Sequence, residues 1–318
     1  MTLTGNTFSF SWEVSLMRWL QAHIGPAGIS VLSFFSVFGE ELMLILILGF
    51  VYCGYSKRLG KTVGLSVLMG LVWNPMIKNI FLRRRPYFDH DGIEILRVVE
   101  PGADIYDISA QGYSFPSGHS TNAMSVYGSL AAGTRKKWLA VLAAALPLLV
   151  GVSRVVVGAH YPTDVLAGWL IGVAAIVVIP WLQSRVRNTA LLYGILLATA
   201  IPGFFYCKSA DYFTGVGLLI GFMGGSLLEE KYVKFDNTKS PLRVALRLLG
   251  GVALYFLLNK LLKLPFSKEF LDGGSLSALM VRSARYAVIA FLEFGVYPVG
   301  FRYTARIGAG KNSAAIQG

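Results

Sequence analysis

Long apolar runs separated by short polar connections dominate the chain. A helix needs about 20 residues to cross the roughly 30 Å hydrocarbon core of a bilayer, and most of these runs approach that length. We expect about nine transmembrane helices, over residues 40–56, 62–82, 119–134, 138–157, 164–183, 189–207, 212–229, 241–262 and 281–301. The pattern therefore predicts an all-α fold, a polytopic transmembrane helical bundle.

The residues before the first predicted span follow a different pattern. Residues 8–37 place apolar side chains at helical spacing, with Trp12 and Trp19 among polar residues. Such amphipathic segments are typical of helices that lie in the membrane interface. We therefore expect residues 1–38 to form interfacial N-terminal helices, with an extension of the first span as the alternative for residues 27–39.

Composition supports an integral membrane protein. The 318 residues are 54% hydrophobic and only 14% charged, with a mean hydropathy of +0.58, whereas soluble domains carry about 25% charged residues. The net charge of +12 does not indicate nucleic-acid binding, because the basic residues lie in short loops between apolar runs. These basic loops share one side of the predicted membrane, which should be cytoplasmic: Lys57/Arg58/Lys61, Arg135/Lys136/Lys137, Arg185/Arg187, Lys231/Lys234/Lys239/Arg243/Arg247 and Arg302/Arg306/Lys311.

Three polar segments interrupt the apolar pattern on the opposite, non-cytoplasmic side. They are residues 78–86, 116–120 and 153–164, and each lies at an end of a predicted span. The topology therefore predicts that all three segments meet at one membrane depth. Their basic residues run against the positive-inside bias and need a separate explanation.

A phosphate group would explain these residues. Lys78, Arg85 and Arg154 supply three positive charges, and arginine binds phosphate oxygens in a bidentate manner. Ser117 and Gly118 precede a predicted helix, whose first N–H groups and positive end can receive an anion. A phosphate suits this set better than a carboxylate because it has enough oxygens for all the donors.

Two histidines suggest a covalent mechanism. His160 precedes Asp164 by four residues, so the two share one face if the helix is already wound there. Asp164 would then hold one ring nitrogen as N–H and leave the other free to attack phosphorus. His119, on another span, is placed to protonate the leaving oxygen and later to deprotonate water.

The three segments resemble the signature of the type-2 phosphatidic acid phosphatase superfamily. That signature reads Lys, six residues, Arg-Pro; then Pro-Ser-Gly-His; then Ser-Arg, five residues, His, three residues, Asp. Every position is matched here, by Lys78, Arg85, Pro86, Pro116, Ser117, Gly118, His119, Ser153, Arg154, His160 and Asp164. The resemblance covers roughly residues 40–183.

The resemblance implies a metal-independent membrane phosphatase with a phosphohistidine intermediate and no cofactor. It makes His160 the nucleophile, Asp164 its orienting partner and His119 the general acid and base. The phosphate-binding residues would be Lys78, Arg85, Ser117, Gly118 and Arg154. The implied architecture is a six-helix phosphatase core over residues 39–187, followed by a transmembrane extension of about three spans over residues 188–318.

The substrate would be a membrane lipid whose head lies on the non-cytoplasmic face, in a bacterial plasma membrane. Undecaprenyl diphosphate leads the candidates, followed by phosphatidate-type lipids. A lipid phosphotransferase would use the same intermediate with another acceptor. A transporter of an anionic lipid is the alternative from a different class, although it predicts ionisable residues near the membrane midplane and an internal repeat.

Other charged or small residues have open roles. Arg83 and Arg84 either contact substrate or snorkel to the interface, while Glu40 and Glu41 either solvate a helix end or face the site. Glu293 lies within the last predicted span and needs a partner, for which Arg282 and Arg285 are the candidates. The glycines at four-residue spacing should allow close helix packing within the chain: Gly217, Gly221 and Gly225.

Overall fold

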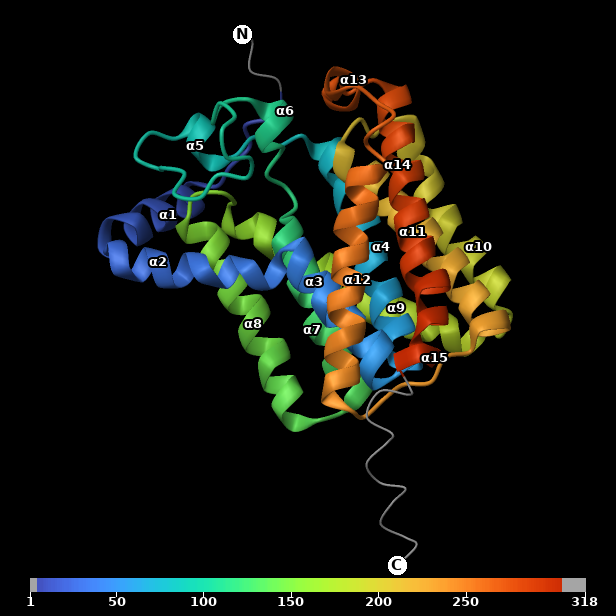
Figure 1. The fold of residues 1–318 in the computed structure, drawn as a ribbon. Helices are drawn as coiled ribbons and strands as arrows, with labels where there is room; N and C mark the ends of the chain where they lie inside the picture. Colours follow the sequence, from blue (N-terminus) through green and yellow to red (C-terminus); the bar gives the residue numbers. More distant parts are fainter. Residues whose placement is uncertain (1–4, 305–318) are drawn as a thin grey trace, which may run out of the picture.

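The computed structural model describes residues 5–304 as a helical bundle (Figure 1). Arg306 and Lys311, which we counted among the cytoplasmic basic residues, lie outside this range. In the part of the chain that is described, the only β-type pairing is an isolated bridge between Asn6 and Arg83. The predicted all-α class is therefore confirmed.

Helices occupy all nine predicted spans. These are α3 (Glu41–Gly49, continued by a π-helical turn to Tyr55), α4 (Lys57–Phe81), α7 (Gly118–Thr134), α8 (Lys137–Val156), α9 (Pro162–Arg185), α10 (Thr189–Ala200), α11 (Ala210–Leu228), α12 (Pro241–Leu261) and α14 (Leu276–Phe291). By length and apolarity α4, α8, α9, α11 with its π-helical continuation, and α12 can each cross a membrane. The remaining four are shorter or more polar than a full span requires. Four short helices lie outside the spans: α5 (Pro86–Asp89), α6 (Ile108–Gln111), α13 (Lys268–Asp272) and α15 (Phe301–Thr304).

The N-terminal segment forms two helices that meet at a sharp bend. Helices α1 (Ser11–His23) and α2 (Pro26–Phe34, extended by a 3-10 turn to Gly39) enclose an angle of 117°. Figure 1 shows α2 running across α8 rather than along it. This arrangement agrees with the predicted interfacial segment, although a broken span of the same length has the same geometry.

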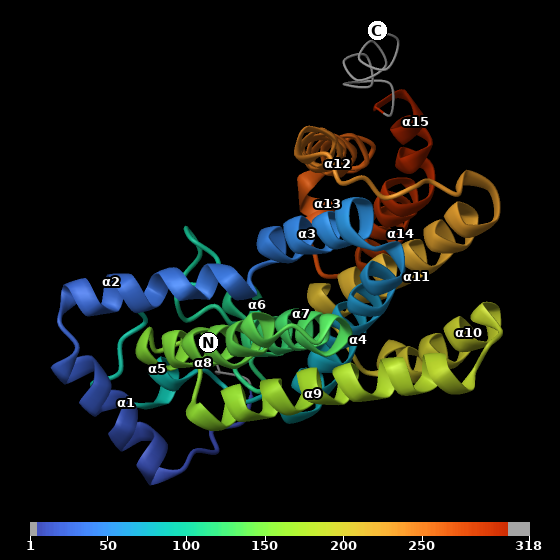
Figure 2. The same ribbon diagram turned by 90° about the horizontal axis from the view of Figure 1, so that it is seen from below.

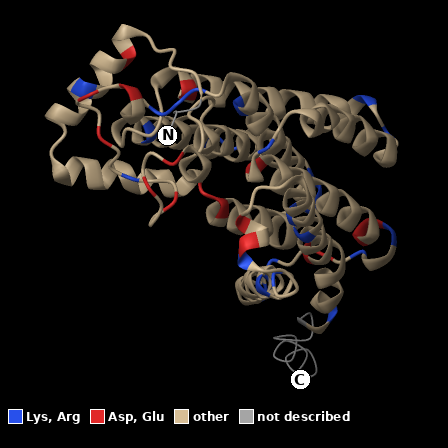
Figure 3. Ribbon diagram, turned by 90° about the horizontal axis from the view of Figure 1, so that it is seen from above, with Lys and Arg blue, Asp and Glu red and all other residues tan. Residues whose placement is uncertain are grey.

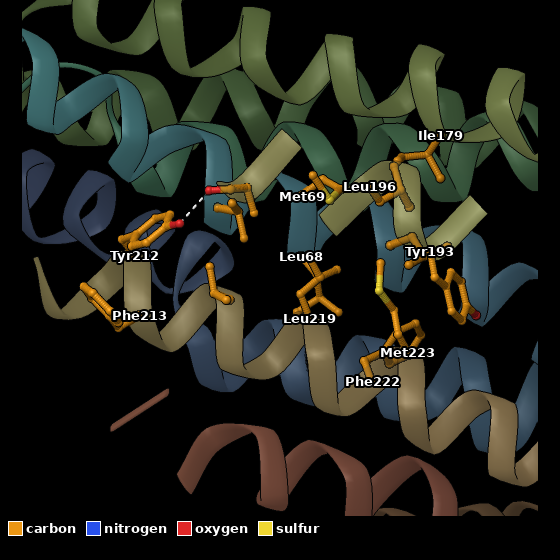
Figure 4. Packing of buried hydrophobic residues seen from close by; sticks show 14 of the residues in the cluster. Leu68, Met69, Ile179, Tyr193, Leu196, Tyr212, Phe213, Leu219, Phe222 and Met223 are labelled. Carbon is orange, nitrogen blue, oxygen red and sulfur yellow. Dashed lines mark hydrogen bonds between the residues drawn. The ribbon is translucent and has the colours of Figure 1, made fainter. Parts of the chain in front are cut away.

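Helix α4 is the central element because it packs against α7 and α9 on one side and against α11 on the other (Figure 2). A hydrophobic cluster fills the space between α4, α10 and α11 (Figure 4). It includes Leu68 and Met69 of α4, Leu196 of α10 and Leu219 of α11. Since α4 contacts helices from both parts, the division into a core and an extension stays a prediction.

The glycines of α11 pack within the chain, as predicted. A Cβ atom at Gly217 or Gly221 would lie within 2.2 Å of backbone oxygens of α14, so only glycine permits this approach. The predicted partners of Glu293 are wrong. Arg282 donates to Thr214 and Arg285 donates to Asn259, so both guanidinium groups are engaged elsewhere.

Candidate active site

Most charged residues lie in loops or near helix ends (Figure 3). The three polar segments of the sequence meet at one end of the bundle, where α4 and α8 finish and α7 and α9 begin. Direct contacts join the segments. The backbone N–H of Ser117 donates to the carbonyl of Asp164 at 2.9 Å, and Arg85 donates to the carbonyl of Ala159 at 2.9 Å.

His160 and Asp164 face each other, but they do not lie on one face of the same helix as the sequence predicted. His160 precedes the helix, and Asp164 is in the first turn of α9, with its carboxylate folded back to accept from the N–H of Tyr161 at 2.8 Å. The His160 Nδ1 atom lies 3.6 Å from Asp164 Oδ2. This distance exceeds a hydrogen bond, so a small movement of the ring is needed to complete the pair. Both side chains are buried.

Arg83 is the main feature of the site that the sequence did not reveal. Its guanidinium is fully buried and bridges two carboxylates, with Asp164 Oδ1 at 2.7 Å and Glu13 Oε2 at 2.9 Å. Neither substrate contact nor snorkelling describes this residue, so both predictions for it are wrong. Arg84 instead forms an ion pair with Asp89. Two isolated acids in the sequence could have indicated this role of Arg83: Glu13 in an amphipathic helix and Asp164 in an apolar span. A buried carboxylate requires a positively charged partner, and Arg83 supplies it for both.

Asp164 is held from several directions. Besides Arg83, the hydroxyl of Ser114 donates to Asp164 Oδ2. Helix α9 also packs closely on the start of α7, because a Cβ at Gly168 would lie only 2.6 Å from the carbonyl oxygen of Ser117. This contact fixes the Asp164 carboxylate, one turn earlier in α9, relative to the segment that carries His119. The position of Asp164 is thus set by α1, α7 and the loop before α7, not by α9 alone.

The three cationic residues are placed around His160. The charges of Arg85, Arg154 and Lys78 all act on the imidazole, and Arg85 and Arg154 also act on His119. Arg85 is oriented by backbone carbonyls, including that of Gln111 at 2.6 Å. Both arginines are buried, and in the described chain neither forms an ion pair with a carboxylate. Their charge is therefore available for an anion.

Arg154 is anchored by a short polar chain. Its Nη1 donates to the hydroxyl of Ser36 at 3.2 Å, and Ser36 lies 2.7 Å from the hydroxyl of Ser153. The Nε atom of Arg154 is buried and has no hydrogen-bond partner within the described residues. One donor of this buried guanidinium is therefore unused.

The helix start at Ser117 supplies fewer donors than the sequence predicted. The N–H of Ser117 is taken by Asp164, and its side chain caps α7 by accepting from the N–H of Ser120. Ser117 thus does not offer its N–H to an anion, and a phosphate contact of this residue stays a prediction for its hydroxyl alone. The N–H of Gly118 is the first of α7 and has no helical partner by position.

His119 lies under the N-terminal segment. A Cβ at Gly39 would come within 2.7 Å of the His119 carbonyl oxygen, so the 3-10 turn after α2 packs directly on this residue. The side chain of Asn122 donates to the Gly39 carbonyl at 3.1 Å and fixes this contact. The sequence did not show that the predicted interfacial segment would cover the site.

The long loop before α7 is attached to the same region. Arg97 donates to the carbonyl of Ser33 at 2.7 Å and forms an ion pair with Glu40. Of the two acids left open by the sequence, Glu40 thus lies near the site, and its charge acts on Arg154. Glu41 accepts from Tyr255 of α12 instead.

Burial shapes the chemistry of the nucleophile candidate. Desolvation, followed by the positive charges of Arg85, Arg154 and Lys78, holds the pKa of His160 well below its ordinary value. A lowered pKa favours the neutral imidazole at physiological pH, and the neutral ring is the nucleophilic form of histidine. Over residues 5–304 no group of three or more His, Cys, Asp or Glu side chains is arranged to hold a metal ion.

Comparison with known proteins adds an independent observation. Residues 59–188 match the family model described as "PAP2 superfamily". Residues 213–308 match the family model described as "PAP2 superfamily phosphatase, transmembrane extension". No solved structure matches the chain.

Three curated relatives share part of the chain. An undecaprenyl-diphosphatase from Sulfolobus acidocaldarius is 27% identical over 175 residues, covering 54% of this chain and 78% of the relative. Phosphatidylglycerophosphatase B from Bacillus subtilis is 33% identical over 90 residues (26% of this chain, 44% of the relative), and a lipid A 1-phosphatase from Rhizobium johnstonii is 36% identical over 106 residues (33% and 40%). The chain spans less than half the length of the last two relatives. With both family descriptions matched, and five of the described helices long and apolar enough to cross a membrane, this integral membrane protein belongs to the PAP2 superfamily.

Proposed function

We propose that the protein is a membrane phosphatase that hydrolyses a lipid phosphate or diphosphate through a phosphohistidine intermediate. The observation that carries this proposal is the buried, neutral His160, which lies 3.6 Å from Asp164 and within the field of three cationic side chains. Few ligands other than a phosphate need that combination of positive charge and a neutral nucleophile.

The first half of the reaction forms a phosphorus–nitrogen bond. Asp164 faces Nδ1 of His160, so Nδ1 carries the proton and Nε2 attacks phosphorus. The bond between phosphorus and the leaving oxygen breaks as His119 donates a proton to that oxygen. Arg85 and Arg154, with Lys78, stabilise the negative charge on the transferred phosphoryl group.

The second half restores the enzyme. His119, now neutral, takes a proton from water, and the hydroxide attacks the phosphorus of phosphohistidine. The phosphorus–nitrogen bond breaks, inorganic phosphate leaves, and His160 returns to its neutral form. The role of Arg83 is to hold the Asp164 carboxylate ionised and in place during both steps.

The substrate class follows from the place of the site. The site lies at span ends, so a lipid can present its head while its tail stays in hydrocarbon. The relatives are named as phosphatases of undecaprenyl diphosphate, phosphatidylglycerol phosphate and lipid A. We place undecaprenyl diphosphate first and phosphatidate-type lipids next, with the site on the non-cytoplasmic face of a bacterial plasma membrane.

The test is inorganic phosphate release in detergent with EDTA present, across a panel of lipid phosphates, lipid diphosphates and water-soluble phosphate esters. Wild type is compared with His160→Ala and with His90→Ala, a matched histidine in the loop after α5. We expect release from at least one lipid, its loss in His160→Ala, and near wild-type rates in His90→Ala.

Two results would overturn the proposal. Release that survives in His160→Ala would exclude this nucleophile. Release that stops with EDTA and returns with a divalent cation would exclude the metal-independent mechanism. A lipid alcohol added as acceptor distinguishes phosphotransfer, because the phosphate then appears on that lipid and not in solution.

A further inference from the structure

A large cavity lies at the opposite end of the bundle from the proposed active site. Its volume is about 1180 Å³, and it is lined by the start of α4, the ends of α7, α9 and α11, and the start of α10. Helix α4 has 25 residues and separates the two regions by roughly 37 Å, which is about one membrane thickness. A phosphate group bound at His160 is therefore too far away to occupy this cavity as well, so the cavity would bind a different group.

The rim of the cavity carries unneutralised positive charge. Lys57 is paired with the buried Glu229 at 2.8 Å, and Lys61 lies 3.4 Å from Glu230. Two further cations line the cavity, Arg58 and Arg187, and neither has a carboxylate partner among the residues that the structure describes. Both arginines are exposed, so they can turn toward an anion at the mouth.

The lining of the cavity also includes apolar surface. Ile176, Pro180 and Leu192 contribute it. The volume slightly exceeds the roughly 300–1,000 Å³ of small-molecule sites. A lining that combines exposed arginines with apolar side chains matches an amphiphile with an anionic head.

We propose that this cavity is a second binding site, which takes a phosphate-bearing lipid head group on the cytoplasmic face. Arg58 and Arg187 bind the phosphate oxygens, and the first part of the tail lies against Ile176 and Leu192. The site is separate from the hydrolytic centre and does not require its chemistry.

A photoactivatable phosphatidylglycerol tests the proposal, because a phosphodiester offers no terminal phosphate for hydrolysis. The full-length protein is placed in phosphatidylcholine nanodiscs that contain this probe, irradiated and digested, and adducts are located by mass spectrometry. We expect adducts on residues 176–193. The double variant Arg58→Gln/Arg187→Gln should lower their yield at least about fivefold, because two charge-assisted contacts are lost.

The matched control removes two positive charges from the same face without touching the cavity, as Lys136→Gln/Lys239→Gln. Adduct yield in this control should stay near wild type. Phosphate release in detergent should be unchanged in both double variants, since none of these residues lies near His160.

The competition arms identify the source of the phosphate. Loss of adducts on adding unlabelled phosphatidylglycerol but not glycerol phosphate supports a lipid occupant, and loss with both supports a phosphate ester recognised without its tail. Absence of adducts on residues 176–193 would overturn the proposal. Equal loss in the two double variants would also overturn it, because attraction to general surface charge would then explain the binding.

Discussion

Replacing Arg83 with glutamine probes the ion-pair bridge that holds Asp164. The guanidinium is fully buried and donates to four oxygens, with distances of 2.7 Å to Asp164, 2.8 Å to Thr163, 2.9 Å to Glu13 and 2.9 Å to the carbonyl of Phe8. Glutamine removes the charge and reaches at most one of these partners. Two buried carboxylates are then left without a counter-charge.

The free energy of unfolding lost in Arg83→Gln should be at the upper end of the range for buried ion pairs. Breaking one buried pair by removing a partner costs about 3–5 kcal/mol, and here one substitution breaks two pairs. The Arg83→Gln variant should therefore lose at least about 4 kcal/mol of the free energy of unfolding. Domains are typically stable by about 5–15 kcal/mol, so a large part of the total is lost.

A second substitution separates this electrostatic cost from loss of packing. Glu13→Gln removes one of the two uncompensated charges, so the double variant Glu13→Gln/Arg83→Gln should be more stable than the sum of the single effects by at least about 1 kcal/mol. The assay is reversible unfolding in mixed micelles by SDS titration, followed by tryptophan fluorescence. The matched control is Arg84→Gln, which breaks one ion pair, with Asp89, where Arg83→Gln breaks two, and which should therefore cost less.

Two results would refute the reasoning. Effects that add within about 0.5 kcal/mol would show that Glu13 and Arg83 are not coupled. A loss in Arg83→Gln no larger than that in Arg84→Gln would show that the bridge is not formed in the membrane protein.

Four further predictions follow from the site and the backbone beside it. Because the pKa of His160 is held below its ordinary value, the unfolded chain binds more protons than the folded one below about pH 6.5. Unfolding free energy should therefore fall from pH 7 to pH 5, and less so in His160→Gln; equal slopes would contradict this. The rate profile should be bell-shaped, and a flat profile from about pH 5 to about pH 9 would oppose the assigned roles of the two histidines. Ser114→Ala removes a donor to Asp164 and should lower kcat with KM unchanged, whereas a rise in KM alone would indicate substrate binding by Ser114. Gly158→Ala should cost at least about 2 kcal/mol in the same SDS titration, because its φ is +76° and a Cβ would lie 2.1 Å from the carbonyl oxygen of Glu94; a neutral effect would contradict this backbone geometry.

The sequence by itself determined the helices and the motif. Apolar length is enough to locate a span because an unpaired backbone in hydrocarbon is costly, which leaves helix as the available structure. The spacing of Arg154, His160 and Asp164 could be read directly, since these residues are close in the chain. Span order then predicted that the 78–86 and 116–120 segments would lie near them.

Only the tertiary structure decided what holds the site together. Arg83, Glu13 and Asp164 are linked across 151 positions of sequence, and no periodicity records such a contact. Two other contacts also join segments that are distant in the sequence. The carbonyl of Asp164 accepts from the Ser117 N–H, and the turn at Gly39 covers His119. The local sequence pattern shows which face of a helix is apolar. Which buried charges neutralise one another depends on how separate helices pack, so only the folded chain determines these ion pairs.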